Sequence, residues 1–194
     1  MSNSHFGRCL PIVFRNFPDM VAHSLDGKMV KIPSNLEGKL NILLIGFKRS
    51  HFVEIESWLP FANEVQNRLN QKQNNPKTIR LYSLILQHPF SYYCFGLGDF
   101  LWRNQFEAEI YRRFDHVIGL FSYFSKKRFI AQMQLPDSQR VYILLVKQNG
   151  EICWCQHDAC DALKKQHMLS ILQLEKEFNI ETAITGTKSK LQIS

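Results

Sequence analysis

A pattern of strand, turn and helix in the first third of the chain constrains the fold more than any other feature. Residues 40–47 form an apolar run with almost no alternation, which is typical of a strand buried on both faces of an α/β sheet. Four polar residues follow at 48–51, and apolar residues then recur at helical spacing over 55–69. Pro60 lies inside this pattern and cannot donate to the carbonyl of Glu56, so we expect a kinked helix.

Length and composition indicate one globular domain with short extensions. The chain has 194 residues, of which 45% are hydrophobic, and a formal net charge of +7. No apolar run approaches the ~20 residues that cross a bilayer. We expect the domain at 17–178, an N-terminal arm at 1–16 and a loose tail at 179–194. The arm has two arginines and no acidic residue, a feature shared with mitochondrial presequences.

The remaining elements predict an α/β domain. Asp26-Gly27 joins two short strands, 17–25 and 29–32, and is a type I′ hairpin signal. Two βα units followed by a ββα ending imply a mixed central sheet with helices on both faces. A strand at 78–86 leads into an α-rich insertion at about 88–135, with helices at 99–114 and from Ser125 to 133 and a partly extended stretch at 116–124. Strands at 141–146 and 151–155 are joined by Asn149-Gly150. The last element is a helix at 159–178, whose apolar side carries Leu163, His167, Ile171, Leu174 and Phe178.

The polar turn after the buried strand offers one set of candidate catalytic groups. A histidine beside two carboxylates, His51 with Glu54 and Glu56, is able in principle to serve acid–base chemistry. No nucleophile or set of metal ligands accompanies these residues in the sequence. A solvated helix start is therefore the favoured interpretation, and the two glutamates suit the positive end of the helix dipole.

The five cysteines do not form a recognisable redox or metal motif. Their odd number argues against a disulfide scaffold, and no pair has Cys-x-x-Cys spacing. A weak candidate for a zinc site consists of Cys153, Cys155, His157 and Cys160, since Cys153 and Cys155 share a face if their strand is regular. We expect structural cysteines, no metal and no cofactor.

An aromatic segment followed by a basic cluster is the most informative candidate for partner binding. Aromatic residues of this density either form a local core or bind a partner or a membrane surface, where nearby basic residues suit an interface. Nucleic-acid binding through the same groups is least favoured, because no recognised motif supports it. The basic residues are otherwise spread along the chain. The candidate residues are Phe90, Tyr92, Tyr93, Phe95, Trp102, Lys126, Lys127 and Arg128.

The opening and the closing hairpin of the domain resemble those of a known superfamily. The opening consists of Phe17-Pro18-Asp19, Leu25-Asp26-Gly27-Lys28 and Leu36-Glu37-Gly38-Lys39. The closing hairpin runs from the strand at 141–146 to Gly150-Glu151-Ile152-Cys153-Trp154. Over 17–178 this arrangement resembles the thioredoxin fold, with the N-terminal hairpin of its peroxiredoxin-like and thiol-reductase branches.

The resemblance implies a degenerate redox site. In thioredoxins the two cysteines lie eight and five residues before the proline that kinks the helix, which here are Phe52 and Ile55. Neither side chain forms a thiolate, the nucleophile of dithiol chemistry. The peroxidase pattern Pro-x-x-x-Thr-x-x-Cys is absent, and Val141 stands where the superfamily has a cis-proline.

Within the superfamily, the layout is similar to the mitochondrial ATP synthase assembly factor, which chaperones the proton-channel subunit. The shared features are a tyrosine-containing strand, with Tyr142, and a Gly-x-Ile-x-Trp return strand, 150–154. This chain departs from the family at Cys153, where a basic residue is usual, and at 156–158, where a Ser-Gly turn is usual.

The resemblance implies a non-catalytic assembly factor or chaperone on the matrix side of the mitochondrial inner membrane. Its partner would be a hydrophobic membrane-protein subunit, and no small-molecule substrate is expected. The alternative is a diverged thiol oxidoreductase or peroxiredoxin-like enzyme that uses Cys94 or Cys155, and a cytoplasmic location remains the alternative to the mitochondrial one.

Overall fold

A computed structural model describes residues 15–87 and 117–174 of the chain. The chain divides into two units, Met1–Ala159 and Cys160–Ser194, which we describe separately. No helix among the described residues is both long enough and apolar enough to cross a membrane.

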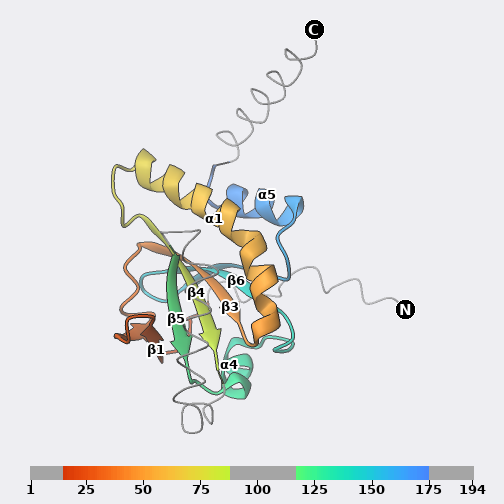
Figure 1. Ribbon diagram of the computed structural model, residues 1–194. Coiled ribbons are helices and arrows are strands. Elements are labelled where there is room, and N and C mark those ends of the chain that lie inside the picture. Colours follow the sequence, from red (N-terminus) through yellow and green to blue (C-terminus); the bar gives the residue numbers. More distant parts are fainter. Residues whose placement is uncertain (1–14, 88–116, 175–194) are drawn as a thin grey trace, which may run out of the picture. The chain divides into compact units, whose positions relative to one another are not determined.

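The first unit is built on a seven-stranded mixed sheet with the order β2-β1-β5-β4-β3-β6-β7 (Figure 1). The three central neighbours β5, β4 and β3 are parallel, whereas each outer strand is antiparallel to the strand beside it. The mixed sheet predicted from the order of elements is confirmed. The strands are β1 Met20–Ser24, β2 Met29–Ile32, β3 Leu40–Gly46, β4 Ile79–Leu86, β5 Val117–Ser122, β6 Tyr142–Lys147 and β7 Ile152–His157.

Strand β3 is the central strand that its apolar sequence predicts. It pairs with β4 on one side and with β6 on the other, and residues 41–46 are all buried. The only polar side chain in this run, Asn41, donates to the carbonyls of Gly38 and Val146 and accepts from the Gly38 N–H. Burial on both faces explains why the strand shows no polar alternation.

Helices cover both faces of the sheet, as the order of elements predicts. Helix α1, Phe52–Lys72, lies across β3 and β4 and buries the side chains of Ile55, Trp58, Leu59, Ala62, Val65 and Leu69 (Figure 1). Helix α4, Lys126–Met133, contributes Phe129 and Met133 to the core on the opposite face, together with Leu43 and Ile45 of β3. Pro60 is exposed within α1.

The two hairpins form where they are expected, but their turns are not type I′. In the first hairpin only Gly27 has a positive φ, +81°, and the Ser24 N–H donates to the Lys28 carbonyl across a three-residue loop. The second hairpin repeats this geometry, with Gly150 at φ +89° and a bond from the Lys147 N–H to the Glu151 carbonyl. A single left-handed glycine that closes a three-residue loop replaces the two left-handed residues that type I′ requires.

The described part of the insertion at 88–135 includes a strand of the central sheet. The stretch at 116–124, which we expected to be partly extended, forms β5, which pairs with β4 and β1. The prediction of an α-rich insertion did not place a strand of the sheet here. Ser125 caps α4, with its hydroxyl accepting from the Arg128 N–H. The helix expected at 99–114, the N-terminal arm up to residue 14 and the tail from residue 175 lie outside the described residues.

The second unit contains α5, Ala162–Ile171, which is shorter than the predicted helix at 159–178. The helix ends at Ile171, and Gln173 then adopts a left-handed backbone with φ +57°. The predicted apolar side is wrong for Leu163, which is 78% exposed, and for Ile171, which is 45% exposed, because Met168 and Leu169 are the buried residues of the helix. Leu174 is buried as predicted, but it lies after the end of the helix. Phe178 lies outside the described residues. Asp161 caps the helix by accepting from the Lys164 N–H.

Candidate functional site

The candidate site lies at the carboxyl end of β3, where the chain passes through the 3-10 turn η1, Arg49–His51, into α1. The end of a central parallel strand that leads into a helix is a common location for chemistry in α/β folds. The start of α4 and the loop at 137–140 both contact this turn through the hydrogen bonds described below.

His51 is almost completely buried, with 1% of its surface exposed, and both ring nitrogens are engaged. The Phe47 N–H donates to Nδ1 at 3.2 Å, and Nε2 lies 2.9 Å from the carbonyl oxygen of Gln139. Because a carbonyl only accepts, Nε2 carries the proton and the ring is the neutral Nε2–H tautomer. Burial lowers the pKa of His51, which keeps the ring uncharged at neutral pH.

Two lysines hold the same turn. The Lys126 ammonium, from the first turn of α4, donates to the carbonyl of Phe47, and burial lowers the pKa of this lysine. The Lys48 ammonium donates to the side-chain oxygen of Gln139 at 2.7 Å. The turn is thus tied to α4 and to the loop at 137–140 by charged donors as well as by the imidazole.

The aromatic ring of Phe47 fills the space under the turn. It is 2% exposed and packs edge-on against Tyr142, with centroids 6.0 Å apart, and against His51 at 6.2 Å. Phe129 of α4 contacts it from the other side at 6.0 Å. The Tyr142 hydroxyl donates to the carbonyl of Asp137 at 2.9 Å, which fixes the loop that carries Gln139.

The positions that align with the redox cysteines lie in the first turn of α1. Phe52 is half-buried and Ile55 is fully buried. Ile55 packs so closely under β3 that a Cβ added at Gly46 would lie 3.1 Å from its Cδ1. Neither position presents a polar group, and the sequence has no cysteine between Cys9 and Cys94.

The acid–base set considered from the sequence is not assembled as a catalytic group. His51 is buried with its nitrogens bonded to the backbone, whereas Glu54 and Glu56 are partly exposed on the first turns of α1. The expectation that His51 belongs to a solvated helix start is therefore wrong. Phe47, Lys48 and Gln139 complete the arrangement and were not predicted as site residues. The available signal was the polar turn that follows a buried strand.

The four candidate metal ligands do not form a cluster. No group of three or more potential ligands gathers anywhere in residues 15–87 and 117–174. The shared face of Cys153 and Cys155 was expected only for a regular strand, and this condition is not met, because a β-bulge places Ile152 opposite Val146 and Trp154 opposite Leu145. Cys153 is the extra residue.

The two thiols of the first unit that the structure describes differ in exposure. Cys155 packs in the core with Ile152 and is 5% exposed, while Cys153 is partly exposed and burial raises the pKa of its thiol. His157 at the end of β7 lies 2.6 Å from the Asp158 carboxylate. In the second unit, burial also raises the pKa of the Cys160 thiol. A raised pKa lowers the thiolate fraction at neutral pH and thus the reactivity.

The basic cluster is divided between two roles. Lys126 turns inward to the Phe47 carbonyl, whereas Lys127 and Arg128 are exposed. The Arg128 guanidinium lies 5.4 Å from the ring centroid of Phe124. The aromatic candidates Phe90, Tyr92, Tyr93, Phe95 and Trp102 lie outside the described residues.

Comparisons by sequence and by structure give different results. No family model matches the chain, and no curated protein matches it by sequence. Solved structures do match. A Chlorobium tepidum protein assigned as thiol:disulfide interchange protein DsbE covers 84% of this chain and 96% of its own, with a TM-score of 0.56 and 15% identity.

Two further structures are similar to the same extent. Arabidopsis thaliana ScoI with copper bound matches over 82% of this chain and 99% of its own, with a TM-score of 0.55 and 14% identity. An uncharacterised thioredoxin-like protein from Porphyromonas gingivalis covers 85% of this chain and 95% of its own, with a TM-score of 0.52 and 15% identity.

The chain has the thioredoxin-like fold, which confirms the fold predicted from the sequence. The central strand, the helix that follows it and the closing hairpin occupy the places expected from the resemblance. Of the three structures named above, one is assigned as a thiol:disulfide interchange protein and one holds copper, and no comparison supports the ATP synthase assembly factor. At 14–15% identity these likenesses show the fold alone.

Proposed function

We propose that this protein has the thioredoxin-like fold without dithiol chemistry at the usual position, and that it acts by binding a protein partner. One observation carries the proposal: the strand-to-helix turn that would present a reactive cysteine is closed by His51, whose two nitrogens bond to the Phe47 N–H and the Gln139 carbonyl. The turn is a structural junction rather than an open reactive site.

The chemistry of thiol–disulfide exchange supports this proposal. Exchange requires a thiolate that is accessible and has a lowered pKa. Phe52 and Ile55 supply no thiol, and the pKa of the partly exposed Cys153 is raised rather than lowered. Nothing among the described residues near the turn replaces the missing nucleophile.

More specifically, the protein would assist the assembly of a hydrophobic membrane-protein subunit. This part of the proposal rests on the resemblance to the ATP synthase assembly factor alone. The exposed residues Lys127 and Arg128 provide a basic surface beside Phe124 that would suit an acidic or membrane-bound partner. The location that goes with this role is the matrix side of the mitochondrial inner membrane.

A turnover assay tests the absence of dithiol chemistry. The purified full chain is given dithiothreitol and insulin, or a peroxide, beside a thioredoxin as positive control. We expect the rate to equal that of the buffer. Turnover above the buffer rate that disappears on alkylation of the cysteines would overturn the proposal.

A capture experiment tests the binding role. Full-length protein with the pair Lys127→Glu and Arg128→Glu is compared with the unchanged protein in pull-downs from detergent-solubilised mitochondria. We expect the unchanged protein to retain a membrane-protein subunit and the variant to lose it. Recovery of no membrane protein by either form would contradict the assembly role.

The second candidate function is a thiol oxidoreductase that uses Cys94 or Cys155. It is favoured by the fold shared with the Chlorobium tepidum protein that is assigned as a thiol:disulfide interchange protein. The burial of Cys155 weighs against it, while Cys94 lies outside the described residues. The rate of alkylation of each thiol as a function of pH separates the candidates: a cysteine with a pKa well below its ordinary value, whose serine variant abolishes turnover, would establish the oxidoreductase.

A further inference from the structure

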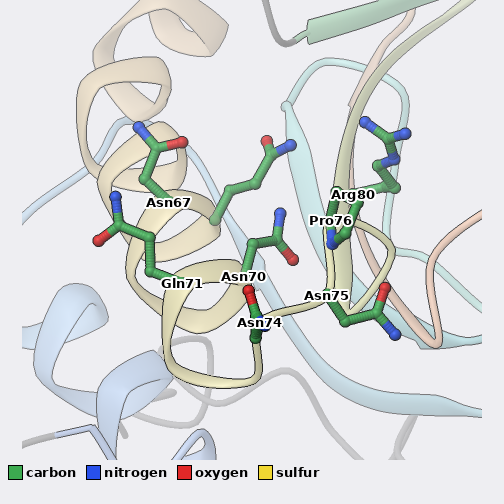
Figure 2. Close-up of a pocket in the computed structure, with 8 residues that line it drawn as sticks. Asn67, Asn70, Gln71, Asn74, Asn75, Pro76 and Arg80 are labelled. Carbon is green, nitrogen blue, oxygen red and sulfur yellow. The ribbon is translucent and has the colours of Figure 1, made fainter.

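The polar pocket near the C-terminal end of α1 does not indicate a ligand class, whereas the outer edge of β7 indicates what covers it. The pocket has a volume of about 360 Å³. Figure 2 shows Asn67 and Gln71 on α1 and Asn74 on the turn that follows, all of them exposed carboxamides without a directing charge. The edge of β7, at one end of the seven-stranded sheet, carries more specific features.

The two edges of the described sheet are protected differently. β2, at one end, is four residues long, carries the exposed Lys31 and is followed by Pro33. The Lys31 carbonyl also accepts from the Asn35 N–H at 2.7 Å. β7, at the other end, is six residues long and contains no lysine, arginine or proline, and its bulge at Cys153 lies near its start. Because sheet edges pair with other strands unless such residues or a covering segment prevent it, we expect a segment to cover β7.

The described residues include the beginning of such a segment. The Phe17 N–H donates to the Gly150 carbonyl, and the Ile152 N–H donates to the Arg15 carbonyl, both at 2.8 Å. The bridge between these two stretches of chain is antiparallel. At residue 15 the chain therefore already lies along the outer edge of the second hairpin. Residues before 15, continued in the same direction, follow β7 towards its C-terminal end.

We propose that residues 10–14 bind the outer edge of β7 as an additional antiparallel strand. Five residues of β7 follow Ile152, and the five residues of this segment match them in length, about 17 Å at the rise of a strand. The segment is rich in the β-branched and aromatic residues that strands favour, and its proline stands near its start, where a strand tolerates a missing N–H. Its sequence is Leu10-Pro11-Ile12-Val13-Phe14.

The bond at Arg15 determines which backbone groups of the segment face β7. In an antiparallel pair, successive residues direct their N–H and carbonyl groups alternately towards the partner strand and away from it. Arg15 bonds to Ile152 through its carbonyl, so Val13, two residues earlier, directs its N–H to β7, and Ile12 directs its own away. This pairing is independent of the protein-binding function proposed above.

Hydrogen exchange followed by NMR tests the pairing. Full-length ¹⁵N-labelled protein is transferred to D₂O, and the amide of Val13 is compared with those of Ile12 and of Asn3, which lies outside the proposed strand. We expect the Val13 amide to exchange at least about tenfold more slowly than the other two, after correction for the intrinsic rate of each residue. Exchange of Val13 as fast as that of Asn3 overturns the proposal.

A mixed sample determines whether the segment belongs to the same molecule. Labelled and unlabelled full-length chains are combined, and isotope-filtered NOEs between Phe14 and β7 are recorded. We expect these NOEs within labelled molecules, at every protein concentration. NOEs that occur only between a labelled and an unlabelled chain would show that a second copy covers the edge, and they overturn the proposal. The absence of any NOE between Phe14 and β7 overturns it as well.

Substitution by proline tests the register of the strand. Val13→Pro removes the N–H that faces β7, and we expect it to abolish the NOEs between Phe14 and β7. Asn3→Pro, the matched control in the same arm, should retain them. Slow exchange of the Leu44 amide in the central strand shows that each variant is folded. Retention of the NOEs in Val13→Pro, or their equal loss in Asn3→Pro, contradicts the assignment.

Discussion

The His51 Nε2–H donates to the backbone carbonyl of Gln139, a residue 88 positions later in the sequence, at 2.9 Å. This bond joins the start of α1 to the loop before β6. The Phe47 N–H donates to the other nitrogen of the same ring. The imidazole thus serves as a buried connector, and its removal should affect stability before anything else.

Replacement of His51 by alanine should destabilise the protein by about 2–4 kcal/mol. The change leaves the Phe47 N–H and the Gln139 carbonyl without their bonds and opens a cavity beside the Phe47 ring. Urea unfolding measures the loss. The matched control is Val53→Ala, two residues later and 75% exposed, which should change the free energy of unfolding by less than about 0.5 kcal/mol. Equal effects of the two variants would contradict the role of His51.

The stability that His51 provides should depend on pH. Burial lowers its pKa in the folded state, so the unfolded chain takes up the proton first as the pH falls. The contribution is complete above the unfolded pKa of about 6.5 and is lost progressively as the pH falls below that value towards the folded pKa. The difference in unfolding free energy between the unchanged protein and His51→Asn should shrink between about pH 7 and pH 5. A difference that grows over this range has the wrong sign for a buried neutral imidazole.

Lys126 and Lys127 should behave differently although they are adjacent. Lys126→Met removes the ammonium that donates to the Phe47 carbonyl and should cost about 1–2 kcal/mol, whereas exposed Lys127→Met should cost almost nothing. For partner capture we expect the opposite: Lys127→Met should weaken binding more than Lys126→Met, because only Lys127 presents its charge at the surface. Thermal unfolding and the pull-down measure the two effects. Equal thermal stability of the two variants would show that the bond from Lys126 to the Phe47 carbonyl does not contribute to the free energy of unfolding.

Gly38 should not tolerate a side chain. A Cβ at this position would lie 2.4 Å from the Leu40 carbonyl oxygen and 2.9 Å from the Arg80 backbone nitrogen, both backbone atoms that cannot move aside. Gly38→Ala should therefore destabilise the protein by about 3 kcal/mol or more. Gly27→Ala is the comparison: it meets no atom within 4 Å and bears only the strain of a positive φ, about 1–2 kcal/mol. The denaturation midpoint of Gly38→Ala should therefore be lower than that of Gly27→Ala. A smaller loss of stability in Gly38→Ala than in Gly27→Ala would contradict the close packing at Gly38.

Local sequence patterns were sufficient to predict an α/β domain with a mixed sheet, whereas the thioredoxin-like fold was predicted from the resemblance of the two hairpins. The run at 40–47 is apolar on both faces because β3 lies between two paired strands, and Gly27 and Gly150 mark turns that need a positive φ. The bulge at Cys153 could not be predicted, since strand register depends on how two strands meet rather than on either strand alone.

The site was harder to predict than the fold. The polar residues at 48–51 suggested a solvated turn, and nothing local indicates that the loop at 137–140 covers His51 or that Lys126 reaches Phe47. These contacts join residues 79 or more positions apart.

The most direct test of the central claim is the protonation state of the His51 ring in the folded protein. A two-dimensional ¹H–¹⁵N spectrum that detects imidazole nitrogens, with His51→Asn for assignment, reports each ring nitrogen separately. The structure predicts the neutral ring at pH 7, with a slowly exchanging proton on Nε2 and none on Nδ1. A doubly protonated ring at that pH, or an Nε2 proton that exchanges as fast as in a solvent-exposed histidine, would contradict the claim that this imidazole closes the turn.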